Sequence, residues 1–136
     1  MANLVSHEVA QAEIAAWLDV RRVSEKKRSE YESTISELVE AVEQGRIVFH
    51  KETGVLDLKL EFPIGETGSV RTLSFNPRLD VAAVRSAIQT LGVKTGDGDG
   101  RLVAYIAAAT KQASGVILKM DTADHSIAGS IALFLM

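Results

Sequence analysis

The sequence predicts an α+β domain in which two N-terminal helices come first, a small three-stranded antiparallel sheet follows, and a C-terminal helical bundle comes last. Two observations carry this prediction. Apolar and charged residues alternate strictly over residues 56–62, which is typical of a half-buried strand. On both sides of that region, apolar residues recur every three or four positions, which is typical of helices. A length of 136 residues favours a single domain over residues 1–136.

Residues 1–45 form an acidic, helical N-terminal segment with five basic and nine acidic side chains. Residues 7–18 predict a short helix. A longer helix is predicted from Ser24, a good N-cap, to residue 44, just before Gly45 at its C′ position. The apolar stripe of this helix covers fewer than two heptads, which favours packing on the local domain over a coiled-coil seam. The stripe consists of Tyr31, Ile35, Leu38, Val39 and Val42.

Residues 46–136 combine the predicted sheet with the later helices. Strands are expected over residues 47–49, 55–62 and 70–75, with a turn at residues 52–54. In the second strand, four apolar side chains point to one face while charged side chains point to the other. We expect the apolar face to be buried, and its members are Leu56, Leu58, Leu60 and Phe62.

Helical spacing returns after the third strand. Asp80 is expected to cap a helix over residues 81–91 that ends at Gly92. Residues 94–100, which are rich in Gly and Asp, predict a flexible loop, and residues 101–112 predict an Ala-rich helix. A short helix or turn over residues 113–120 precedes a last helix. Asp121 is expected to cap that helix, with Asp124 in its first turn near the positive end of the helix dipole.

No formally charged side chain follows Asp124. The apolar stripe of the last predicted helix must therefore pack either inside its own domain or against another chain, a second copy included. The single tryptophan leaves a similar choice between a core anchor and an interface hot spot. The candidate partner-binding residues are Trp17, Ile127, Ile131, Phe134 and Leu135.

No combination of residues predicts catalysis, so we expect the chain not to be an enzyme and to use no cofactor. The absence of cysteine excludes a thiolate nucleophile and a disulfide framework. Residues 97–100 resemble the start of a calcium loop, but Arg101 stands where a third oxygen ligand is needed. Asp124, His125 and Ser126 are neighbours in a predicted helix, where side chains point about 100° apart and cannot form a relay. No metal site is expected either, because ligand spacing is missing from His7, His50 and His125.

The net charge of −3 disfavours nonspecific binding to nucleic acid. One basic cluster stands out, but glutamates dilute it and no aromatic residues interleave with it, which favours a solvated helix start or a protein-docking face over a phosphate grip. No apolar run approaches the roughly 20 residues that span a bilayer, and the first ten residues do not resemble a signal peptide. We therefore expect a cytoplasmic protein with no membrane partner. The basic cluster consists of Arg21, Arg22, Lys26, Lys27 and Arg28.

The C-terminal half of the chain carries a recognisable series of packing and capping residues. The series is Leu-Ser-Phe-Asn-Pro-Arg at residues 73–78, the helix after Asp80, Arg-Leu-Val-Ala-Tyr-Ile-Ala-Ala-Ala-Thr at residues 101–110, and Ile-Leu-Lys-Met-Asp at residues 117–121 with Asp124, Ile127, Ile131 and Phe134. In this order it resembles the tail assembly chaperones of long-tailed bacteriophages. The resemblance covers a little under half of the chain, residues 73–136, and includes no catalytic motif.

The resemblance implies a non-catalytic protein of phage tail morphogenesis that acts in the bacterial host cytoplasm. Its implied partners are the tape-measure protein and the tail-tube protein. Two features depart from the family pattern, namely the helices at residues 7–44 and the glycine-rich loop at residues 94–100. They keep a second role open, that of a structural tail or baseplate-associated protein in the virion. A third alternative is a small regulator that contacts nucleic acid through the basic cluster.

Overall fold

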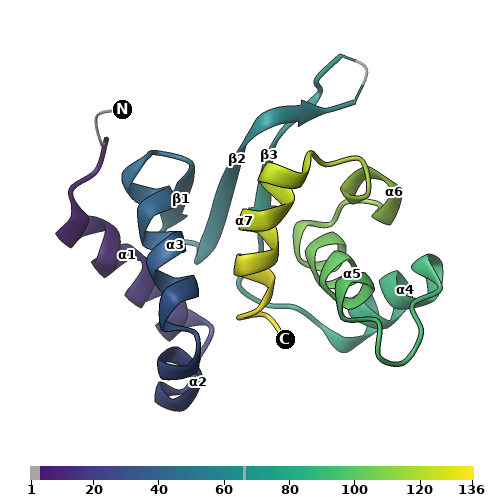
Figure 1. The fold of residues 1–136 in the computed structure, drawn as a ribbon, viewed down its shortest axis with the longest axis horizontal. Helices are drawn as coiled ribbons and strands as arrows, with labels where there is room; N and C mark the ends of the chain where they lie inside the picture. The colour runs from purple at the N-terminus through teal and green to yellow at the C-terminus, as the bar shows by residue number, and fades with distance from the viewer. Residues whose placement is uncertain (1–3, 66) are drawn as a thin grey trace.

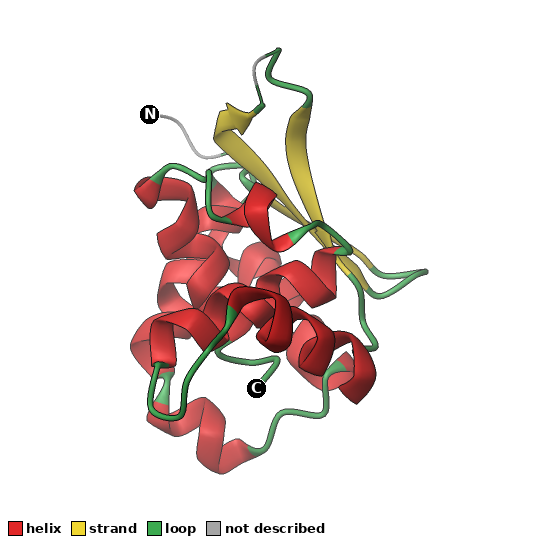
Figure 2. Cartoon of the chain, turned by 90° about the vertical axis from the view of Figure 1, so that its right-hand side faces the viewer, coloured by secondary structure: helices red, strands yellow, loops and turns green. Residues whose placement is uncertain are grey.

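The structure is a computed structural model that describes residues 4–65 and 67–136. Among these residues it contains seven helices and a three-stranded antiparallel sheet, which confirms the α+β class. Figure 1 shows the elements in order, and Figure 2 shows that most helices gather on one side of the sheet. The elements are α1 (His7–Val20), α2 (Glu25–Glu30), α3 (Glu32–Glu43), β1 (Ile47–His50), β2 (Val55–Ile64), β3 (Val70–Phe75), α4 (Val81–Leu91), α5 (Gly98–Thr110), α6 (Ser114–Ile117) and α7 (Thr122–Ala132).

The predicted helix over residues 24–44 is wrong in one respect, because it is two helices. Ser24 caps α2 as expected, with its hydroxyl accepting from the Lys27 amide at 3.2 Å. The chain then leaves helical geometry at Tyr31 (φ −112°, ψ 34°), and α3 begins at the next residue. The break lets the Tyr31 ring meet the ring of Phe134 edge-on, with centroids 6.0 Å apart. A contact made over a hundred residues away therefore overrides the continuous helical pattern.

The sheet has the order β1-β2-β3, with Leu56 opposite Phe75 and Leu58 opposite Leu73 across β2 and β3. The expected burial of one β2 face is correct for Leu56, Leu58 and Leu60 and wrong for Phe62, which is 49% exposed. The reason is a register irregularity between Lys59 and Ile64, which interrupts the regular alternation. Beyond this point the β2–β3 hairpin extends past the helices, as Figure 1 and Figure 2 show.

The different burial of Leu58 and Phe62 on one strand predicts different losses of stability. We expect Leu58→Ala to lower the free energy of unfolding by about 2–5 kcal/mol, because Leu58 is fully buried and its loss leaves a cavity. Phe62→Ala, on the same strand but half exposed, should cost less than about 1 kcal/mol. Urea unfolding of both variants measures the difference. Equal losses for the two would contradict the register irregularity.

The predicted loop at residues 94–100 is also only partly correct, because α5 begins at Gly98. Asp97 caps this helix by accepting from the Gly100 amide at 3.0 Å. A Cβ at position 100 would collide with the Asp97 carboxylate, so glycine is what permits the cap to form. Asp80 and Asp121 cap α4 and α7 as predicted, and Gly92 ends α4 in the left-handed conformation.

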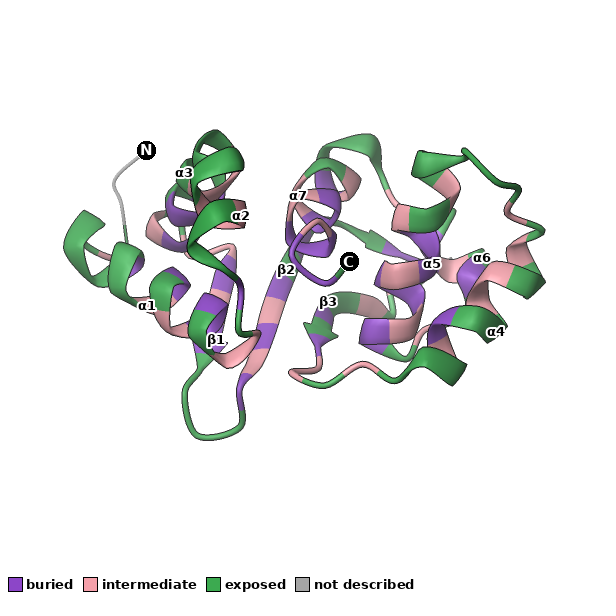
Figure 3. Ribbon diagram, turned by 90° about the horizontal axis from the view of Figure 1, so that it is seen from below, coloured by how far each residue is buried: buried purple, intermediate pink, exposed green. Residues whose placement is uncertain are grey.

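Helix α7 lies in the middle of the molecule, packed against α3, α5 and β2. It separates α1, α2 and α3 on one side from α4, α5 and α6 on the other (Figure 1). Buried residues from both sides belong to one hydrophobic core cluster, and Figure 3 shows them gathered along α7 and β2. The helix expected to end a C-terminal bundle is thus the element that both halves share.

Candidate interaction surface

The candidate partner-binding residues lie mostly inside the chain's own core. Trp17, Ile131, Phe134 and Leu135 are buried, and Ile127 is half-buried. The Trp17 ring meets the Phe134 ring edge-on, with centroids 6.1 Å apart and planes at 86°. Of the two alternatives left by the sequence, the structure therefore places the apolar end in the core. Trp17 lies there as a core anchor, and neither feature offers a free surface.

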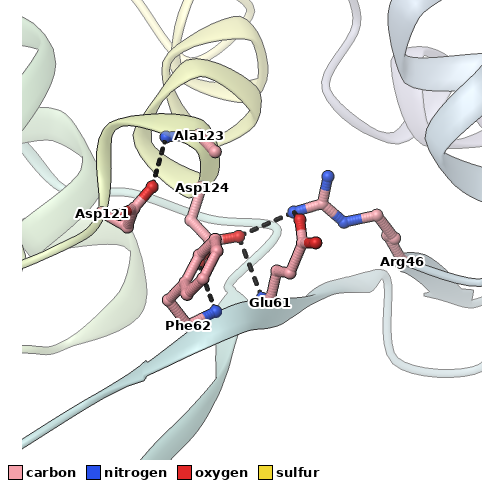
Figure 4. A network of polar contacts seen from close by, with 6 residues as sticks. All are labelled: Arg46, Glu61, Phe62, Asp121, Ala123 and Asp124. Carbon is pink, nitrogen blue, oxygen red and sulfur yellow. Dashed lines mark hydrogen bonds and ion pairs between the residues drawn. The ribbon is translucent and has the colours of Figure 1, made fainter.

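Asp124 carries the main polar network of the interior, shown in Figure 4. Its side chain is 1% exposed. One carboxylate oxygen accepts from Arg46 Nη2 at 2.6 Å and from the Glu61 amide at 3.0 Å, and the other accepts from the Phe62 amide at 2.9 Å. The two amides belong to the irregular part of β2, where the regular sheet pairing is interrupted.

The expected place of Asp124 in the first turn of α7 is confirmed, but its carboxylate bonds to β2 and Arg46 and does not cap the helix. Asp121 alone provides the side-chain cap of α7, accepting from the Ala123 amide at 2.9 Å. Asp124 instead fastens the start of α7 to the irregular stretch of β2. Sequence reasoning missed Arg46, its ionic partner, because the two residues lie 78 positions apart and no spacing rule links them. Glu61 adds little to this pair, since its carboxylate is 3.9 Å from Arg46 and 59% exposed.

Two arginines of the basic cluster in the N-terminal segment form hydrogen bonds within the chain itself. Arg28 donates to the Val23 carbonyl at 3.0 Å and pairs with Asp19 at 2.8 Å. Arg21 donates to the carbonyl oxygens of Pro77 at 2.8 Å and Leu135 at 3.4 Å. These contacts bind the α1–α2 turn to the β3–α4 connection and to the residues after α7. Arg21 and Arg28 thus contact their own domain, while Arg22 and Lys26 are exposed. The choice between a solvated helix start and a protein-docking face stays a prediction.

A cation distant in sequence joins this cluster. Arg78 Nη1 donates to the Val20 carbonyl at 3.0 Å and to the Pro77 carbonyl at 3.2 Å, which Arg21 also contacts. Lys27 Nζ lies 3.3 Å from the Met136 carbonyl oxygen. Burial, and secondarily the charge of Arg78, lowers the pKa of Arg21. Burial, and secondarily the charge of Arg21, lowers the pKa of Lys27. The partly buried Arg21 is therefore repelled by Arg78 and in turn repels the partly buried Lys27.

The other candidate sites of the sequence are not brought together. His7 Nδ1 lies 2.7 Å from a Glu43 oxygen, and His50 Nε2 lies 2.7 Å from an Asp57 oxygen, on different elements. Within residues 4–65 and 67–136, no group of three or more His, Cys, Asp or Glu side chains could hold a metal ion. In the same part of the chain, no helix is long and apolar enough to cross a membrane.

A surface groove of about 400 Å³ lies between α4 and α5. We call it the α4–α5 groove. Its apolar lining comes from both helices, from the loop before α4 and from the residues after α7, and two arginines join it. Its one acidic lining residue, Asp80, is engaged as the α4 cap, accepting from the Ala83 amide at 2.7 Å. The apolar and basic lining residues used below are Leu79, Val81, Val84, Ile88, Leu135, Arg85 and Arg101.

Comparisons of the chain with models of known protein families, with curated protein sequences and with solved structures return no match. The resemblance to phage tail assembly chaperones therefore stays a prediction. The α4–α5 groove is one of several on the described part of the chain, and apolar side chains, two arginines and Asp80 line it.

Proposed function

We propose that the chain is a non-catalytic protein of bacteriophage tail morphogenesis that acts as a tail assembly chaperone, holding the tape-measure and tail-tube proteins in the bacterial host cytoplasm. One observation carries the proposal. Every residue that lines the α4–α5 groove falls within residues 73–136, the segment that carries the resemblance. The part of the chain that resembles such chaperones is thus the part that builds the α4–α5 groove.

In this proposal, the C-terminal helices α4 to α7 act together as a bundle that binds a helix of the partner protein. An apolar groove between two helices is a common way to receive the apolar face of a third. Leu135, which follows α7 and is buried, forms part of the groove lining. The apolar chain end then supports the docking surface instead of forming it.

The polar network around Asp124 has a structural role in this proposal. The buried Asp124 carboxylate accepts three hydrogen bonds, from one guanidinium and two amides, which occupy most of its acceptor sites. Its sequence neighbours His125 and Ser126 do not contact it through any of these bonds. Such an arrangement supports a scaffold for binding better than a site for acid–base chemistry.

The test is co-expression of the full chain with the tape-measure and tail-tube proteins encoded in the same genome. We expect a stable complex by size-exclusion chromatography with light scattering, and no chain in purified virions. Presence in purified virions would favour the structural tail or baseplate role instead. Strong, salt-dependent retention on DNA would favour the nucleic-acid regulator. A genome without those two genes, or no complex with either product, would refute the proposal.

A further inference from the structure

Five cations border the α4–α5 groove and the residues after α7. Arg85 and Arg101 line the groove itself. Arg78 immediately precedes Leu79, which also lines it, and Arg21 donates to the carbonyl of Leu135, which forms part of its floor. The guanidinium groups of Arg21 and Arg78 meet at one oxygen, the Pro77 carbonyl, at 2.8 and 3.2 Å. The fifth cation is Lys27, which lies beside the Met136 carbonyl.

None of the five forms an ion pair with an Asp or Glu side chain in the part of the chain that the structure describes. The polar bonds of Arg21, Lys27 and Arg78 go to backbone carbonyls, which use only some of their donors. The Nε of Arg21 is buried without a hydrogen-bond partner. The chain has 18 acidic residues and a net charge of −3, yet no acidic side chain among the described residues pairs with these five cations.

The groove lining also includes apolar side chains. Val81 is 74% exposed at its edge, although it begins α4. Val84, Ile88 and Leu79 continue the apolar lining along α4 and the loop before it. An apolar strip with cations along its edges complements a helix that carries apolar side chains on one face and carboxylates beside them.

Nucleic acid fits this surface less well. The one aromatic ring in the lining is Tyr105, and Arg101 already lies over it at 6.0 Å. Binding of single strands relies on stacking against several aromatic faces along a basic track. The overall negative charge also opposes long-range attraction of a polyanion.

We propose that the α4–α5 groove binds an acidic amphipathic helix of a partner protein. The apolar side chains of that helix lie on Val81, Val84 and Leu79, and its carboxylates pair with Arg78, Arg85 and Arg101. This inference rests on the proposed function only in taking the chain as a binding protein. It names the surface and the chemistry of the bound segment, whichever protein supplies it.

Two synthetic 18-residue peptides test the proposal. Both carry leucines at helical spacing, and they differ only in having Glu or Gln beside the leucine stripe. Isothermal titration calorimetry should show that the full chain binds the Glu peptide about tenfold more tightly than the Gln peptide. Amide chemical shifts of the labelled chain should change at residues 79–105.

The double variant R85Q/R101Q should bind the Glu peptide about tenfold more weakly than the unchanged chain. Neither side chain makes a hydrogen bond or ion pair within the described residues, so the fold should be kept. R71Q is the matched control, because it removes one charge from an exposed position on β3, outside the groove lining. R78Q is a further variant on the groove edge, with circular dichroism as the check on folding.

Four results would overturn the assignment: no saturable binding of the Glu peptide, equal binding of both peptides, shifts confined to residues outside the groove, or an equal loss in R71Q. Tighter binding of a DNA duplex that R85Q/R101Q also weakens would make the groove a nucleic-acid site instead. A tail-protein complex unaffected by R85Q/R101Q would refute this inference and leave the proposed function standing. Binding of the Glu peptide without any tail-protein complex would refute the proposed function and leave this inference standing.

Discussion

Replacing Asp124 by alanine should lower the free energy of unfolding by about 3–5 kcal/mol. The variant leaves the partly buried Arg46 guanidinium without its close partner and deprives the Glu61 and Phe62 amides of their acceptor. Losing one partner of a buried pair costs more than the pair contributes, because the remaining charge stays desolvated. Guanidinium unfolding of the purified chain at 25 °C measures the effect.

Two controls separate this network from simpler effects. Asp121→Ala removes the α7 cap and should cost about 1 kcal/mol. Glu61→Gln removes the distant, exposed member of the network and should change stability by less than about 0.5 kcal/mol. If Asp124→Ala proved no worse than Asp121→Ala, the carboxylate would be a second helix cap, and the bond to β2 would be unimportant.

Phe134→Ala is the second change with a large expected effect, about 3–5 kcal/mol of lost stability. The Phe134 ring fills the space between Trp17 of α1 and Tyr31 at the α2–α3 break, with both rings edge-on to it. Removing it leaves a cavity where the N-terminal helices meet the end of α7. Thermal unfolding followed by tryptophan fluorescence reports on the same place, because Trp17 is the single tryptophan.

Leu118→Ala is the matched control, since Leu118 is an exposed apolar residue just after α6 and should tolerate the change within about 0.5 kcal/mol. Removal of residues 131–136 should abolish cooperative unfolding, because it deletes four buried side chains at once. If Phe134→Ala kept its melting temperature while self-association or partner binding fell, the apolar end would be an interface, and its burial in the core would be refuted.

Local chemistry made several elements predictable from the sequence. Ser24, Asp80 and Asp121 each cap the expected helix because a short polar side chain reaches an amide two or three residues on. The faces of β3 follow from alternation, with Leu73 and Phe75 buried. In each case the signal and its structural cause lie within a few positions of one another.

Two of the failures involve contact between distant segments. The break at Tyr31 follows its packing on Phe134, and the exposure of Phe62 accompanies the binding of its amide by Asp124. The early start of α5 differs, since Asp97 gives a local cap that Gly98 and Gly100 hide by their low helix propensity.

The candidate surface was less predictable than the fold. The apolar stripe of α7 was recognised, but periodicity cannot decide whether a stripe faces a core or a partner. The basic cluster was recognised too, but its extension by Arg78 depends on how the β3–α4 connection passes the α1–α2 turn. The α4–α5 groove has no sequence signature, because a concave surface is a property of two helices and their crossing.

The central place of α7 has a consequence for how the chain acquires its structure during synthesis. The helix that joins the two helical groups leaves the ribosome after all the elements on which it packs. Until it emerges, α3, α5 and β2 each lack the surface they finally cover, and Arg46 has no close anionic partner. The nascent chain therefore keeps apolar surface exposed on both sides of the sheet region until α7 completes the core through long-range contacts.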